Sequence, residues 1–398
     1  MSAMPDLPPP DEDALAHSGR LLDRMRDELE RQDGWMSFER YMEMALYEPG
    51  LGYYSAGSRK LGAEGDFVTA PEISPLFSRC LASQCAEILG ALGGGDILEL
   101  GAGSGIMAAD VLAELREQGC LPRRYLILEV SADLRARQRA TLQARVPDLM
   151  DRIFWLDAAA EPIVGIVLAN EVLDALPVQR FRIRGPHVNT LGVTWQLGRL
   201  DWSEVRASRS LENTVRSIEL TLGHPLPDGY TSEVNQRLAP WLQTLGQSLH
   251  RGVMLFIDYG LPRAQYYRAE RMTGTLLCHY RHRFHDDPFR FPGLQDIGAW
   301  VDFSAVAASA IDSGLTVAGF TTQAHFLIGT GIDRLLADLA GQRIESRLQI
   351  ARQVMVLTLP AEMGERFKVL ALARDYETPL KGFAIRDLSG SLHVARRT

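Results

Sequence analysis

Continuous apolar runs recur in the middle of the chain, separated by segments with helical spacing. Apolar runs without polar alternation are typical of strands buried on both faces, as in a parallel sheet, whereas apolar residues three and four positions apart indicate helices. The pattern therefore predicts alternating elements, with strands near residues 97–100, 125–130, 153–156, 166–169 and 253–257 and helices near 106–118 and 134–144.

The flanking segments add further elements on both sides of this region. A capping-box pattern, Thr69-Ala70-Pro71-Glu72, predicts the start of a helix that reaches about residue 89. The remaining expectations are helices near 15–33, 38–46, 233–249, 303–313 and 331–353, strands near 316–320 and 367–373, a hairpin-like stretch at 181–205 and a loop at 261–300.

Together these elements predict an α/β fold: a doubly wound, seven-stranded, mostly parallel sheet with helices on both faces and an antiparallel last strand. We expect a disordered tail at 1–14, an N-terminal helical cap at 15–90, and a main domain at 91–398 with insertions near 178–230 and 261–300. The cap and the insertions would form a helical and irregular second lobe over the strand ends.

Charge and composition narrow the classes of partner. The net charge of −8 and the isoelectric point of about 5.7 give no basic surface that would argue for nucleic acid. The sequence has no apolar run of the ~20 residues that a membrane span needs. Its N-terminus lacks the features of a signal or transit peptide, so we expect a cytoplasmic protein.

Metal binding is not expected either. The four cysteines are scattered and have no zinc-ligand spacing. His279, His282 and His285 recur every third residue, but they lie in an arginine-rich stretch without a nearby cysteine, which is a poor zinc site.

A glycine loop supplies the main functional signal. The predicted strand 97–100 runs into Gly101-Ala102-Gly103-Ser104-Gly105, and a helix is predicted to follow. Glycines allow unusual backbone torsions and close approach of a ligand, and a helix start offers N–H groups to it. A dinucleotide fingerprint would require glycine at Ile106, and a P-loop would require a following Gly-Lys-Ser/Thr. The G-x-G-x-G form after Leu-Glu-Leu is typical of Rossmann-like class I methyltransferases, which use S-adenosyl-L-methionine, and Glu99 joins the three glycines as a candidate cofactor residue.

Acidic residues end the next two predicted strands. Glu129 could accept hydrogen bonds from both ribose hydroxyls of a nucleoside, and Asp157 could contact an adenine edge. Both would lie at the carboxyl ends of parallel strands, where open α/β sheets bind their ligands. The alternative for each is a solvated carboxylate at a strand end.

Further blocks show a resemblance to a known family. The chain resembles the MidA family, which includes a mitochondrial complex I assembly factor that methylates protein arginine. The resemblance runs from about residue 37 to the last strand. It is carried by the blocks Tyr41-Met42-Glu43-Met44-Ala45-Leu46-Tyr47, Gly65-Asp66-Phe67-Val68-Thr69-Ala70-Pro71-Glu72, Asn170-Glu171-Val172-Leu173-Asp174-Ala175-Leu176-Pro177, Asp258-Tyr259-Gly260 and Val301-Asp302-Phe303.

This resemblance implies a protein arginine methyltransferase whose substrates include a respiratory complex I subunit. Glu171 is the first candidate and Asp174 the second for binding a guanidinium, because carboxylates bind that group bidentately. His282 could shape the acceptor pocket. Asp66, Thr69 and Asn170 complete the candidate cofactor site.

Three other functions stay open from the residues. The chain could be a non-catalytic assembly factor that binds the cofactor structurally, or it could methylate a small molecule. A dinucleotide-dependent dehydrogenase is disfavoured by Ile106.

Overall fold

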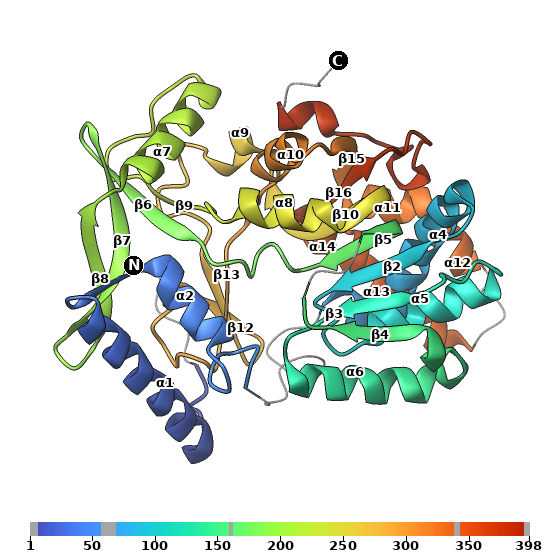
Figure 1. Ribbon diagram of the computed structural model, residues 1–398, viewed down its shortest axis with the longest axis horizontal. Coiled ribbons are helices and arrows are strands. Elements are labelled where there is room, and N and C mark those ends of the chain that lie inside the picture. Colours follow the sequence, from blue (N-terminus) through green and yellow to red (C-terminus); the bar gives the residue numbers. More distant parts are fainter. Residues whose placement is uncertain (1–6, 57–68, 159–161, 338–342, 394–398) are drawn as a thin grey trace. The chain divides into compact units, whose positions relative to one another are not determined.

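The computed structural model describes residues 7–56, 69–158, 162–337 and 343–393 (Figure 1). The chain forms two compact units that are interleaved in sequence. We call residues 68–173, 239–261 and 301–398 the parallel-sheet unit, and residues 1–67, 174–238 and 262–300 the antiparallel-sheet unit.

The parallel-sheet unit contains a twisted sheet with the strand order β15-β16-β10-β5-β2-β3-β4, and β14 pairs with β10 outside this order. Neighbours from β10 to β4 run parallel, whereas β16 is antiparallel to both β10 and β15. The predicted fold class, with its antiparallel last strand, is confirmed. The strands are β2 (Asp96–Leu100), β3 (Tyr125–Leu128), β4 (Ile153–Leu156), β5 (Ile163–Asn170), β10 (Leu249–Leu261), β14 (Val301–Asp302), β15 (Thr316–Thr322) and β16 (Phe367–Arg374).

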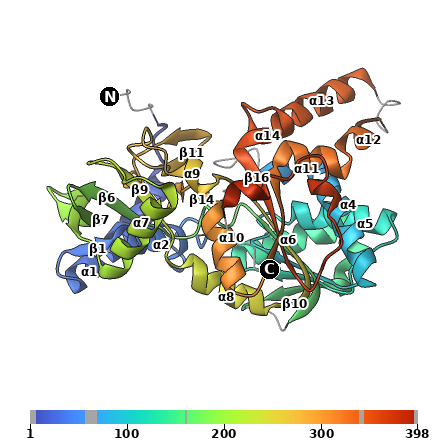
Figure 2. The same cartoon turned by 90° about the horizontal axis from the view of Figure 1, so that it is seen from above.

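Helices cover both faces of this sheet. Figure 2 shows α8 and α10 on one side and α4, α5 and α11 on the other. The central strands β2 and β5 are almost entirely buried, as continuous apolar runs require. The helices are α3 (Ala70–Ile73), α4 (Pro75–Leu92), α5 (Ile106–Glu117), α6 (Ala132–Arg145), α8 (Leu238–Gln247), α10 (Phe303–Asp312), α11 (Gln323–Thr330), α12 (Ile332–Ala337), α13 (Ile344–Thr358) and α14 (Met363–Arg366), with short 3₁₀ turns at Pro147–Arg152, Lys381–Phe383 and Ser389–Leu392.

Two predicted helices are wrong in their extent. The helix expected from Pro71 is interrupted at Ser74, which is extended because Pro75 disfavours the helical region for the residue before it. Ser74 then caps α4 by accepting a hydrogen bond from the amide of Leu76. The helix expected over 233–249 begins only at Leu238, since the preceding residues pair with another strand.

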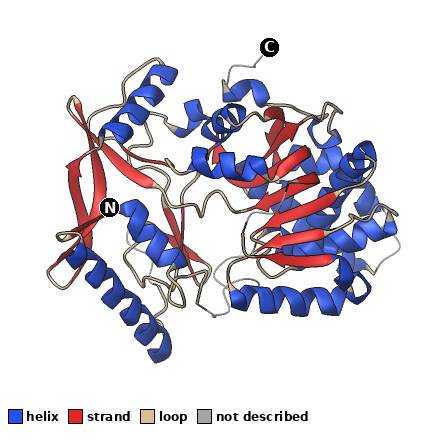
Figure 3. Cartoon of the chain, in the orientation of Figure 1, coloured by secondary structure: helices blue, strands red, loops and turns tan. Residues whose placement is uncertain are grey.

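The antiparallel-sheet unit contains a five-stranded sheet and a three-stranded sheet among the described residues (Figure 3). The predicted helical and irregular character of this part, with a loop at 261–300, is therefore wrong, because short strands there pair with one another. The hairpin-like stretch is confirmed as three consecutive antiparallel strands. The elements are α1 (Glu12–Arg31), β1 (Trp35–Ser37), α2 (Phe38–Tyr47), β6 (Gln179–Arg184), β7 (His187–Gln196), β8 (Arg199–Arg206), α7 (Arg209–Leu222), β9 (Thr231–Val234), α9 (Arg263–Tyr266), β11 (Leu277–Tyr280), β12 (Arg283–His285) and β13 (Asp296–Gly298).

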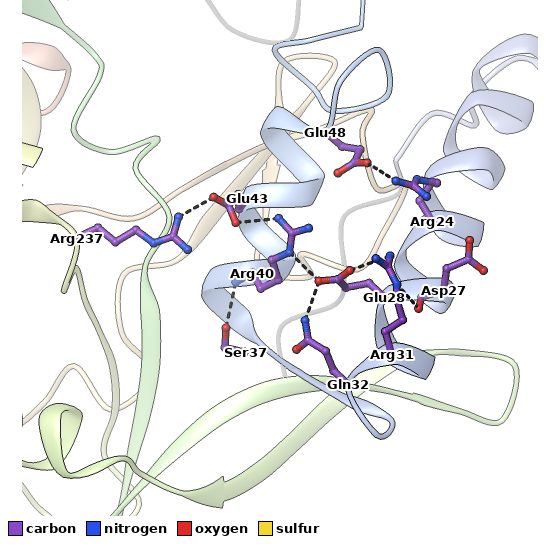
Figure 4. A network of polar contacts seen from close by, with 10 residues as sticks. All are labelled: Arg24, Asp27, Glu28, Arg31, Gln32, Ser37, Arg40, Glu43, Glu48 and Arg237. Atoms are coloured by element: carbon purple, nitrogen blue, oxygen red, sulfur yellow. Dashed lines mark hydrogen bonds and ion pairs between the residues drawn. The ribbon is translucent and has the colours of Figure 1, made fainter. Parts of the chain in front are cut away.

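A network of charged side chains joins α1 to α2 in this unit (Figure 4). Glu28 is buried and accepts hydrogen bonds from Gln32 at 2.7 Å and from Arg40 at 3.0 Å, and it pairs with Arg31 at 2.9 Å. Burial alone would raise the pKa of the Glu28 carboxyl, but Arg40 and Arg31 outweigh burial and hold that pKa below its ordinary value. The network therefore favours the ionised carboxylate.

We expect Glu28→Gln to lower the free energy of unfolding by about 1–2 kcal/mol, because it leaves Arg40 with a weaker partner in a half-buried position. Urea denaturation at pH 7 measures the change. Glu30→Gln, on the exposed face of the same helix, is the matched control and should leave stability within about 0.5 kcal/mol of the wild type. Equal effects of the two substitutions would contradict a structural role for the network.

In the part of the chain that the structure describes, no helix combines the length and the apolar character that crossing a membrane requires.

Candidate functional site

The glycine loop joins β2 to α5, as the sequence predicts. Gly101, Gly103 and Gly105 have φ values of 62°, 53° and 81°, a region that disfavours side chains. Gly105 also permits close packing, because a Cβ there would lie 3.0 Å from Cα of Gln138 in α6. The three glycines are therefore required by the backbone torsions of the loop and by its contact with the neighbouring helix.

A hydrogen bond from Ser104 fixes the loop to the short helix α3. Ser104 Oγ donates to Glu72 Oε1 at 2.5 Å. The capping box predicted for Thr69 and Glu72 is wrong: Thr69 occupies the N-cap position of α3 without a side-chain hydrogen bond to the helix, and the Glu72 carboxylate accepts from the glycine loop instead. The other residue predicted in this segment, Asp66, lies outside the described residues.

Glu99 lies in β2 immediately before the loop and is completely buried. Its Oε2 accepts a hydrogen bond from the hydroxyl of Tyr125 in β3 at 2.7 Å. Burial raises the pKa of the Glu99 carboxyl to about 7, although the bond from Tyr125 opposes that rise. This carboxyl can therefore hold or release a proton near neutral pH.

Glu129 follows β3 and is also buried. Its Oε1 accepts from the amide of Ser131 at 2.8 Å, and its Oε2 accepts from Nε2 of Gln138 at 3.1 Å. Burial raises the pKa of the Glu129 carboxyl, and the hydrogen bonds from Ser131 and Gln138 act in the opposite direction. The carboxylate is held by short, fixed contacts and is suited to accept hydrogen bonds from hydroxyl groups.

Asp157 follows β4 and is much more exposed. Its side chain is 90% exposed and pairs with Arg135 at 2.7 Å. Arg135 also donates to the backbone carbonyls of Glu129 and Leu156, so it joins the ends of two neighbouring strands.

Asn170 is the last residue of β5, and Glu171 follows it directly. Glu171 has a positive φ of 53°, which is uncommon for a residue with a side chain, and its amide donates to the carbonyl of Ile257 in β10 at 2.8 Å. Nδ2 of Asn170 donates to Glu171 Oε1 at 3.2 Å. Oδ1 of Asn170 is buried, and it has no hydrogen-bond partner among the described residues. A buried acceptor without a donor is suited to a polar ligand group.

Asp258 fixes this turn, a role that the sequence analysis did not assign. It is buried at the end of β10, and its Oδ2 accepts from the amide of Leu173 at 2.9 Å. Its place at the carboxyl end of a buried parallel strand was the available signal. Gln138 was missed altogether, since a glutamine inside a predicted amphipathic helix gives no signal in sequence.

Two predicted residues belong to the antiparallel-sheet unit. Asp174 is buried, and its carbonyl accepts from the amide of Ala299 at 3.1 Å. His282 is exposed at the two-residue turn between β11 and β12, where Arg281 and His282 have φ values of 46° and 59°. Positive φ at both central positions is typical of a tight hairpin turn. Within the described residues, histidine, cysteine and carboxylate side chains form no group that could hold a metal ion.

The strand order, the glycine loop and the carboxylates at the strand ends define a Rossmann-like methyltransferase that uses S-adenosyl-L-methionine. The model of a family of S-adenosyl-L-methionine-dependent methyltransferases matches residues 80–321. The chain belongs to this family, and the MidA resemblance is confirmed.

A solved structure from Burkholderia thailandensis, bound to S-adenosyl-homocysteine, is 41% identical and superposes with a TM-score of 0.93, covering 97% of this chain and 100% of that one. Among curated relatives, "Protein arginine methyltransferase NDUFAF7, mitochondrial" of Danio rerio is 29% identical over 85% of this chain and 83% of its own length. Its Drosophila melanogaster homologue is 29% identical over 92% and 89%. The cofactor is therefore S-adenosyl-L-methionine.

The comparison with curated relatives also contradicts the predicted cytoplasmic location, which is wrong. The curated relatives from Danio rerio, Drosophila melanogaster and Homo sapiens are all named as mitochondrial proteins. An N-terminus without a recognisable targeting pattern was a weak basis for assigning a compartment.

Proposed function

We propose that this methyltransferase modifies arginine side chains of a protein substrate and that Glu171 orients the guanidinium. The observation that carries the proposal is the turn after β5, where Glu171 has a positive φ and its amide donates to the carbonyl of Ile257. Asn170 donates to the Glu171 carboxylate, and Asp258 accepts from the amide of Leu173 in the same turn. Strained backbone persists where surrounding contacts hold it, often at functional sites. The names of the curated relatives support the same acceptor.

The chemistry requires alignment more than acid–base catalysis. The cofactor supplies an electrophilic methyl group, and an arginine nitrogen must lie in line with it. A guanidinium stays protonated at physiological pH and is a weak nucleophile. The Glu171 carboxylate would bind it bidentately, orient one nitrogen and stabilise its charge. The amide of Asn170 holds Glu171 Oε1 and thereby limits the side-chain conformations of that carboxylate.

The cofactor would be held at the carboxyl ends of the parallel strands, beside Asn170 and Glu171. We assign Gly101, Gly103 and Gly105 to its closest backbone contact, Glu129 to the ribose hydroxyls and Asp157 to the adenine edge. Asn170 Oδ1, a buried acceptor, suits a donor group of the cofactor. Glu99, Thr69 and Asp66 complete the proposed set.

The substrate is proposed to be a polypeptide. The MidA resemblance extends this proposal to a subunit of respiratory complex I. The roles of Asp174 and His282 in binding the acceptor stay predictions from the sequence.

Glu171→Gln tests the proposal. We expect it to retain cofactor binding and to slow arginine methylation at least about 100-fold, because the neutral amide loses the charge-assisted grip on the guanidinium. The measurement is methylarginine formation by mass spectrometry, with release of S-adenosyl-homocysteine, after incubation with cofactor and a cell lysate.

The matched control is Glu117→Gln, an exposed carboxylate at the end of α5, which should keep wild-type activity. Methylarginine formed by Glu171→Gln at the wild-type rate would remove Glu171 from the mechanism. Turnover of the cofactor by the wild type without any methylarginine would exclude arginine as the acceptor.

A further inference from the structure

Gln138 in α6 has a completely buried polar side chain. Its carboxamide contacts three segments at the carboxyl ends of the strands, where the cofactor is proposed to bind. Its Nε2 donates to the carbonyl of Gly103 at 3.1 Å and to Oε2 of Glu129 at 3.1 Å. Its Oε1 accepts from Nε1 of Trp155 in β4 at 2.9 Å. The side-chain amide of Gln138 therefore joins the glycine loop, the Glu129 carboxylate after β3 and Trp155 in β4.

The partners of Gln138 determine which way its amide points. An indole N–H can only donate, so the carboxamide oxygen must face Trp155. The carbonyl of Gly103 can only accept, so the two N–H groups must face Gly103 and Glu129. Glu129 Oε2 accepts the second N–H, and an ionised carboxylate accepts it more strongly than a neutral carboxyl group does. The three contacts are satisfied together in one orientation, and that orientation favours the ionised form of Glu129.

The surroundings hold this amide in place. The guanidinium of Arg139 lies over the ring of Trp155, with its Cζ 4.4 Å from the ring centroid. Gly105 allows α6 to approach the loop, since a Cβ there would lie 3.0 Å from Cα of Gln138. Arg139 therefore packs on the indole that donates to the amide, and Gly105 lets the backbone of Gln138 lie close to the glycine loop.

We propose that Gln138 is a positioning residue that sets the glycine loop and the Glu129 carboxylate in the geometry that binds cofactor, and that it favours the ionised form of Glu129 in that geometry. The proposal rests on the cofactor roles proposed above for Gly103 and Glu129. Other charges near this carboxylate are Arg135, which donates to the Glu129 carbonyl, and Asp157, which pairs with Arg135. The side chain of Asp157 is exposed, whereas that of Arg135 is half-buried.

Gln138→Met tests the proposal, because methionine has a similar length and no amide. Calorimetric titration with S-adenosyl-homocysteine should show a dissociation constant raised about 10- to 50-fold, which corresponds to the loss of hydrogen bonds at a charged group. The acid side of the affinity–pH profile should also move to higher pH, since the Glu129 carboxylate loses a donor that stabilises it.

Gln138→Glu should give the opposite dependence on pH. At low pH a shared proton can hold the introduced carboxyl group and Glu129 together, whereas at higher pH the two carboxylates repel each other. Affinity should therefore fall as pH rises. If Gln138 only filled space, neither Gln138→Met nor Gln138→Glu would change the dependence of affinity on pH.

Three further variants separate the outcomes. Leu142→Met, one turn along α6 and also buried, controls for packing and should keep the wild-type affinity and pH profile. Trp155→Phe removes the indole donor and should weaken binding about 2- to 5-fold, which tests the same contact if Gln138→Met fails to fold. Glu129→Ala tests the cofactor site itself.

Weaker binding by Glu129→Ala together with wild-type affinity and pH profile in Gln138→Met would overturn the role of Gln138 and leave the proposed cofactor site standing. Wild-type affinity in Glu129→Ala would overturn the assignment of Glu129 itself.

Discussion

Replacement of Gly165 by alanine is expected to unfold the parallel-sheet unit, with a loss of about 4 kcal/mol or more in the free energy of unfolding. Gly165 lies in β5 with a φ of 152°, and a Cβ there would lie 1.9 Å from the carbonyl oxygen of Asp96 in β2. β5 cannot shift to relieve this clash, because it pairs with β2 on one side and with Gly252 of β10 on the other. Loss of the cooperative transition in urea, followed by circular dichroism, measures the effect.

Gly90→Ala is the matched control in the same unit. Gly90 lies near the end of α4, and a Cβ there would meet no atom within 4 Å. Because alanine favours helix over glycine, this variant should be as stable as the wild type or more stable by up to about 1 kcal/mol. Similar stability of Gly165→Ala and Gly90→Ala would show that the central strands can separate, contrary to the close approach in the structure.

Replacement of Glu99 by glutamine is expected to stabilise the protein more at pH 8 than at pH 5. The pKa of Glu99 rises from 4.5 to about 7 in the folded chain, so the folded state binds more protons than the unfolded state between these values. The contribution of protonated Glu99 is fully present below about pH 4.5 and is lost as pH rises through about 7. Glutamine does not ionise, so the difference between variant and wild type should grow by about 3 kcal/mol over this window.

Urea denaturation at intervals between pH 4.5 and pH 8 checks this expectation. The groups common to both proteins cancel in the difference, which isolates the contribution of Glu99. Tyr125→Phe removes the hydrogen bond that favours the carboxylate and should destabilise the protein more at pH 8 than at pH 5. A difference between Glu99→Gln and the wild type that stays constant with pH would show that Glu99 titrates normally in the folded chain.

The elements of the central sheet were predictable because their pattern is local. The strand at Ile153–Leu156 was predicted with its observed bounds, and the helix from Ile106 begins where expected. The helix at 233–249 was misplaced because Glu233 belongs to a strand that pairs with β6, a non-local contact. The capping box failed for a similar reason, since Glu72 bonds to Ser104, 32 residues away.

The sequence by itself determined the fold class and the cofactor, because three glycines after a buried strand, together with a carboxylate at the end of the next strand, are local patterns tied to backbone torsion and strand burial. Only the tertiary structure decided how these groups are held. The contacts of Gln138 with Gly103, Glu129 and Trp155, and of Asp258 with Leu173, join residues up to 85 positions apart. Hydrogen bonds of this kind depend on the spatial order of the strands, which local periodicity does not record.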